Sequence, residues 1–71
     1  MYEVVLRDGG TYTISKEQVE YWKMLYPNLD VESELSYLKE MWTKDAISRK
    51  TAKGINKFIN RWLYKQNEEE L

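Results

Sequence analysis

The chain begins with alternating apolar and polar positions. Tyr2, Val4 and Leu6 occupy every second position, and the alternation returns in the segment TYTI after the turn residues DGG. Period-two patterns on both sides of a glycine-containing turn are typical of a β-hairpin, here over residues 2–14. Because an isolated hairpin is only marginally stable in water, its apolar face is expected to pack on other elements.

The register of this hairpin is predicted from the loop that keeps apolar residues together. A two-residue loop, 8–9, mixes apolar and polar side chains on each face. A three-residue loop, 8–10, pairs Leu6 with Tyr12 and Val4 with Ile14, and places Gly10 in the left-handed conformation. We therefore predict the second register. Its apolar face holds Tyr2, Val4, Leu6, Tyr12 and Ile14.

Two helical patterns follow the hairpin. Ser15 is a good N-cap, and Gln18 three residues later completes a capping-box pattern. This helix ends before Pro27, and its apolar positions are Val19, Trp22 and either Leu25 or Tyr26. A second helix is predicted to begin near Asp30, and residues 43–48 form a connector. The apolar positions of the second helix are Val31, Leu35, Leu38 and Trp42.

The third helical pattern is the most regular in the chain. Thr51 is its predicted N-cap, and the acidic segment 66–71 after it is expected to be a frayed tail. The core-facing positions recur at i, i+3, i+4, i+7 and i+8; they are Ile55, Phe58, Ile59, Trp62 and Leu63. Residues 1–65 are thus expected to form a single compact domain. The predicted fold is α+β, with an N-terminal β-hairpin packed on a three-helix bundle, in the order β-β-α-α-α.

Composition narrows the chemistry. The 71 residues include no cysteine and no histidine, which excludes disulfides, a thiolate nucleophile and a histidine base. We expect a protein that is not an enzyme, with no cofactor and no metal site. The first residues lack the apolar core of a signal peptide, and no apolar run approaches 18 residues. We therefore expect a cytoplasmic protein that does not enter membranes.

Charge is distributed unevenly along the chain. Residues 1–43 carry 4 basic and 8 acidic side chains, residues 44–65 carry 7 and 1, and residues 66–71 carry 3 acidic ones. The local charges of −4, +6 and −3 sum to the net charge of −1. At about 100° per residue, one side of the third helix collects four cations opposite the apolar stripe. We call Lys53, Lys57, Arg61 and Lys65 the basic band.

The start of the third helix resembles an anion site. Arg49, Lys50 and Lys53 gather where the helix dipole disfavours cations, which suggests a partner of opposite charge. Free amides at a helix N-terminus and the Thr51 hydroxyl would add hydrogen bonds to phosphate. The predicted DNA-binding residues are therefore Arg49, Lys50, Thr51, Lys53, Asn56, Lys57, Asn60, Arg61 and Lys65, with Asn56 and Asn60 directed at base edges.

The aromatic residues have a simpler interpretation. Trp22, Trp42 and Trp62 are predicted core residues, because each falls on an apolar stripe. Three tyrosines are expected at the edge of the core, where a ring near a basic helix can also stack on unpaired bases; they are Tyr21, Tyr37 and Tyr64.

The chain also resembles a known family. Its most specific segments are Tyr26-Pro27, Asp30-Val31-Glu32, Arg49-Lys50-Thr51, Gly54, Phe58-Ile59-Asn60 and Trp62-Leu63. From about residue 11 to residue 65 these are similar to a small module of phages and integrated mobile elements, found as the C-terminal domain of replication-associated proteins and as short stand-alone proteins. The resemblance implies a role in DNA replication or transfer and no enzyme activity. The connector differs, with KDAIS where the module has Asn-Pro.

The sequence leaves three functions open. The leading interpretation is a DNA-binding accessory protein of a mobile element, which contacts phosphates through the third helix. The alternative is an adaptor that docks the same helix on an acidic replication or transfer protein, or on the acidic half of another copy; the sequence pI of about 5.4 favours it. A third is a structural module whose charges serve solubility. Strand preference, sequence specificity and oligomeric state are also open.

Overall fold

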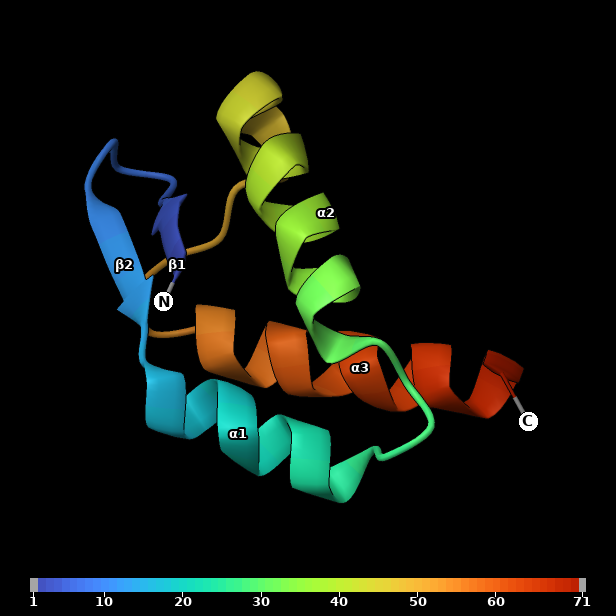
Figure 1. The fold of residues 1–71 in the computed structure, drawn as a ribbon. Helices are drawn as coiled ribbons and strands as arrows, with labels where there is room; N and C mark the ends of the chain where they lie inside the picture. Colours follow the sequence, from blue (N-terminus) through green and yellow to red (C-terminus); the bar gives the residue numbers. More distant parts are fainter. Residues whose placement is uncertain (1, 71) are drawn as a thin grey trace.

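A hairpin and three helices build the molecule, as the sequence predicts. The structure is a computed structural model that describes residues 2–70, without the side chain of residue 70. Its elements are β1 (Tyr2–Val5), β2 (Thr11–Ile14), α1 (Lys16–Leu25), α2 (Val31–Lys44), the short 3-10 helix η1 (Ala46–Ser48) and α3 (Ile55–Glu70). Figure 1 shows the hairpin beside α2, and α1 and α3 lie side by side below them, joined by hydrogen bonds from Gln18 and Trp22 to α3.

The hairpin has the predicted apolar face but not the predicted register. Tyr2 pairs with Ile14 and Val4 with Tyr12, so the three-residue loop is 7–9 and not 8–10. Leu6 accepts a hydrogen bond from the Gly9 amide, and Gly9 is the left-handed residue at φ +89°. The carboxylate of Asp8 also accepts one from the Gly10 amide at 2.9 Å. These bonds close a three-residue loop whose third position takes the left-handed conformation that glycine favours. The position of Gly9 therefore sets the register.

The helix boundaries follow the capping residues. The side chain of Ser15 accepts a hydrogen bond from the Gln18 amide, and that of Asp30 accepts one from the Ser33 amide. The hydroxyl of Thr51 accepts one from the Gly54 amide, and a turn over 52–54 leads into α3. At the other end α3 continues to Glu70, so the structure describes residues 66–70 as helix, and the fraying of this acidic segment stays a prediction.

One core joins the hairpin to all three helices. Its buried members are Val4, Leu6, Ile14, Val19, Trp22, Leu29, Val31, Leu35, Leu38, Trp42, Ile55, Ile59 and Leu63. Every apolar position predicted on the second helix is buried. At the end of α1, Tyr26 packs on the core while Leu25 remains 47% exposed. Of the two candidates for the last apolar position of this helix, the structure therefore selects Tyr26. Trp62 and Phe58 are only half-buried, because they lie where α3 meets the side of α2.

Candidate nucleic-acid interface

The basic band forms an exposed face. Lys53 lies in the turn before α3, and the other three members follow at intervals of four residues along the helix. All four side chains are exposed, while the opposite side of α3 buries Ile55, Ile59 and Leu63 completely. Because the inner face of α3 packs in the core, the three cations on its outer face point away from the core.

The members of the band make no salt bridge with any side chain that the structure describes. Two cations outside the band do have partners: Lys23 lies 2.5 Å from Glu32, and Lys44 lies 2.7 Å from Glu40. The hydrogen bond from Lys23 lowers the pKa of Glu32, and the Lys44 bond does the same for Glu40. The positive charge of α3 is therefore not neutralised within the fold.

The band ends toward the C-terminus of α3. Glu68 lies eleven residues after Lys57, about three turns along the same side of the helix. A hydrogen bond to the Glu68 carboxylate, together with its negative charge, raises the pKa of the Tyr64 hydroxyl. The exposed face of α3 is thus positive over its first turns and carries a carboxylate near its end.

Arg49 has a structural role that sequence reasoning missed. Its Nε donates a hydrogen bond to the carbonyl of Trp42 at 2.7 Å, and its Nη2 donates to that of Thr43 at 3.3 Å. These carbonyls belong to the last turn of α2, where a cation also interacts favourably with the helix dipole. The predicted phosphate contact is therefore a half-buried helix cap. The sequence signal for it was weak, because six residues separate Thr43 from Arg49.

Lys50 and Thr51 also serve the fold. The Lys50 Nζ lies 4.4 Å from the centre of the Phe58 ring, a cation–π contact. Its carbonyl accepts a hydrogen bond from the Arg7 amide at 2.8 Å, which ties the hairpin loop to the start of α3. The Thr51 hydroxyl satisfies the Gly54 amide, one of the donors that the predicted anion site required.

Asn56 and Asn60 are exposed, yet both side chains bond to neighbouring groups of the protein. The Asn60 Oδ1 accepts a hydrogen bond from the Trp22 indole at 2.8 Å, and its Nδ2 donates to the Asn56 carbonyl. The Asn56 Oδ1 accepts one from the Gln18 side chain. Both amides therefore join α1 to α3, and base edges would have to displace these bonds. We leave both out of the interface.

Two further surface features were not predicted. On one side of α3, Trp62 stacks on Tyr37 with ring centres 5.8 Å apart and donates its indole N–H to Glu34 at 2.9 Å.

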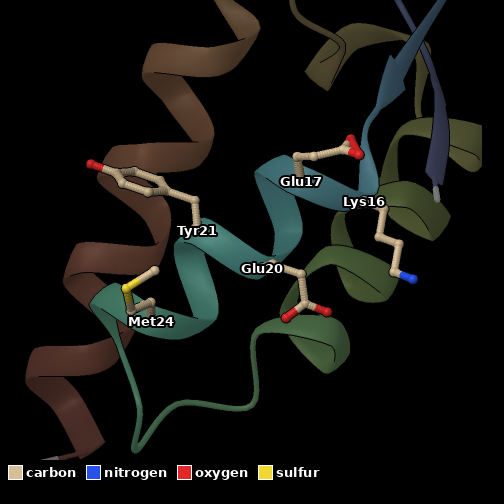
Figure 2. A pocket seen from close by; sticks show the side chains of 5 residues that line it. All are labelled: Lys16, Glu17, Glu20, Tyr21 and Met24. Atoms are coloured by element: carbon tan, nitrogen blue, oxygen red, sulfur yellow. The ribbon is translucent and has the colours of Figure 1, made fainter.

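The second feature is an open hollow on α1, shown in Figure 2. It is lined by Lys16, Glu17, Glu20, Tyr21 and Met24. The exposed Met24 was detectable in the sequence, because it falls outside the stripe set by Val19 and Trp22.

Other kinds of site find little support in the part of the chain that the structure describes. Residues 2–70 contain no group of three or more acidic side chains placed to hold a metal ion. None of the described helices is both long and apolar enough to span a bilayer. No family model, curated protein or solved structure matches this chain. The resemblance to the phage module therefore stays a prediction.

Proposed function

We propose that this chain is a non-enzymatic, cytoplasmic DNA-binding accessory protein of a phage or integrated mobile element. It contacts phosphates through the basic band of α3. The observation that carries the proposal is that the band's four cations are exposed and have no salt-bridge partner among the described side chains. The mobile-element context rests on the sequence resemblance alone.

The geometry of the band suits a phosphate backbone. Lys65 follows Lys57 by eight positions, or about 12 Å of helix, with Arg61 midway. Duplex DNA presents roughly seven phosphate charges over that length, so each cation has phosphates within reach. With the side-chain oxygens of Asn56 and Asn60 hydrogen-bonded to Gln18 and Trp22 of α1, the band supplies charge without base readout. Binding should therefore depend little on base sequence.

Fluorescence anisotropy with labelled duplex and single-stranded oligonucleotides tests the proposal. The wild-type protein should bind at low salt, and the triple variant Lys53→Glu, Lys57→Glu, Arg61→Glu should not. A matched control, Arg7→Glu, Lys16→Glu, Lys39→Glu, changes the net charge equally at exposed cations outside the band and should retain most of the binding. Equal losses in the two variants would mean that the band has no special role.

An adaptor function is the second candidate. The sequence pI of about 5.4 favours it, because DNA-binding domains are usually basic as a whole. In that case the band docks on an acidic protein surface. The two functions separate in the same titration: an adaptor shows no nucleic-acid binding even at low salt, yet binds a labelled Glu-rich peptide and loses it in the triple variant.

A further inference from the structure

The outer face of α1 has the opposite character to the basic band. We define this face as Glu17, Glu20, Tyr21 and Met24, all of them exposed. Figure 2 shows this face from the front, with Tyr21 and Met24 extending to one side and the carboxylates of Glu17 and Glu20 to the other, where Lys16 also lies. The side chain of Met24 is 75% exposed and that of Tyr21 55%. The face thus combines two carboxylates with apolar surface that nothing in the described chain covers.

The two faces lie next to each other on the molecule. Gln18 bonds to Asn56 and Trp22 to Asn60, and both pairs are separated by 38 residues, so α1 and α3 run in the same direction (Figure 1). At about 100° per residue, Glu17 and Tyr21 then face the same way as Lys57 and Tyr64. The surface formed by α1 and α3 is therefore acidic and apolar on one half and basic on the other.

Such a surface is complementary to itself. A two-fold axis parallel to the two helices turns α1 of one molecule onto α3 of another, in parallel orientation, and repeats the contact on the other side. The apolar surface supports this pairing. Large apolar side chains are exposed at six described positions, and four of them lie on these two helices: Tyr21, Met24, Leu25 and Tyr64.

We propose that the outer face of α1 binds the basic band of a second copy of this chain, forming a symmetric dimer. Glu17 and Glu20 of each copy face Lys57 and Arg61 of the other, and Tyr21 and Met24 pack beside Tyr64. This inference goes beyond the proposed function and does not depend on it. It adds a consequence: the dimer covers cations that phosphates would contact, so nucleic acid and the second copy compete.

A charge-swap experiment tests the dimer by sedimentation velocity at low salt. The wild-type protein should change from monomer to dimer over about a hundredfold range of concentration, because association follows mass action. The variant Glu17→Lys, Glu20→Lys should stay monomeric, since its interface is then positive on both halves. The variant Lys57→Glu, Arg61→Glu should also stay monomeric, since its interface is negative on both halves.

Mixing the two variants provides the decisive control. Each contact in the mixed pair joins a positive face to a negative one, so dimers should reappear at wild-type concentrations. A chain that carries all four substitutions should likewise dimerise with itself. A wild-type protein that is monomeric throughout, or variants that stay monomeric when mixed, would overturn the inference. Neither result bears on the proposed function, because the Glu17→Lys, Glu20→Lys variant keeps the whole basic band for nucleic-acid titration.

Discussion

The inner and outer sides of α3 have different roles. The inner side places Ile55, Ile59 and Leu63 in the core without exposure, and it connects α3 to the rest of the fold. The outer side carries Lys57 and Arg61 in solvent, with no salt bridge to a described side chain. This difference indicates that substitutions on the inner side should change stability, whereas those on the outer side should change binding.

The largest effect should come from the inner side. Replacing Ile59 with alanine removes buried methylene and methyl groups and leaves a cavity, which typically costs about 2–5 kcal/mol of unfolding free energy. Urea unfolding followed by tryptophan fluorescence measures the change. Where the variant remains folded, its nucleic-acid affinity should match that of the wild type. A large loss of affinity in the folded variant would mean that the two sides are not independent.

The next effect concerns Asn60, which lies between the two sides. In Asn60→Ala the buried Trp22 indole loses its acceptor, and an unsatisfied buried donor costs about 1–3 kcal/mol. The loss should shrink when Trp22→Phe is also present, because that ring has no N–H to satisfy. Additive losses in this double-mutant cycle would show that the hydrogen bond contributes nothing, and lost DNA affinity would restore Asn60 to the interface.

Replacing Arg49 should also lower the free energy of unfolding, but by less. Arg49→Met removes two hydrogen bonds to carbonyls at the end of α2, with an expected loss of about 1 kcal/mol at this half-exposed position. Its effect on nucleic-acid affinity should be much weaker than that of Arg61→Met, which removes a charge of the same type from the band. Equal effects of the two substitutions on affinity would place Arg49 back among the phosphate contacts.

The smallest effect on stability is expected at Lys23, a cation that already has a salt-bridge partner. The pKa of Glu32 is lowered by its bond to Lys23, so this pair stabilises the fold above the ordinary glutamate pKa. That contribution disappears as the pH falls through the lowered pKa. A carboxyl NMR titration should give a midpoint for Glu32 below that of an ordinary glutamate, and Lys23→Met should raise it toward the ordinary value. An unchanged midpoint in this variant would exclude the pair as the cause.

The sequence predicts features that follow from local patterns better than features that depend on specific contacts. Apolar periodicity located the strands, the helices and the core positions of α2, because burial follows from the pattern itself. The hairpin register was wrong because loops 7–9 and 8–10 place the same residues on the apolar face. Pattern cannot separate them, and the bonds at Asp8 and Gly9 do.

The sequence likewise predicted only the part of the candidate site that follows from a local pattern. Helical spacing predicted the basic band, because exposed positions opposite an apolar stripe follow from the helix alone. The hydrogen bonds of Arg49, Asn56 and Asn60 depend on where α2 ends and on which side of α3 the helix α1 packs. Those are tertiary facts that no local pattern carries.

The salt dependence of duplex binding tests the central claim most directly. If all four cations of the band contact phosphates, the logarithm of the binding constant should fall with that of salt concentration with a slope of about −3.6. Lys57→Gln should reduce the steepness by about 0.9. A lack of binding at low salt, or a slope that Lys57→Gln and Arg61→Gln leave unchanged, would contradict the assignment of the basic band as the nucleic-acid interface.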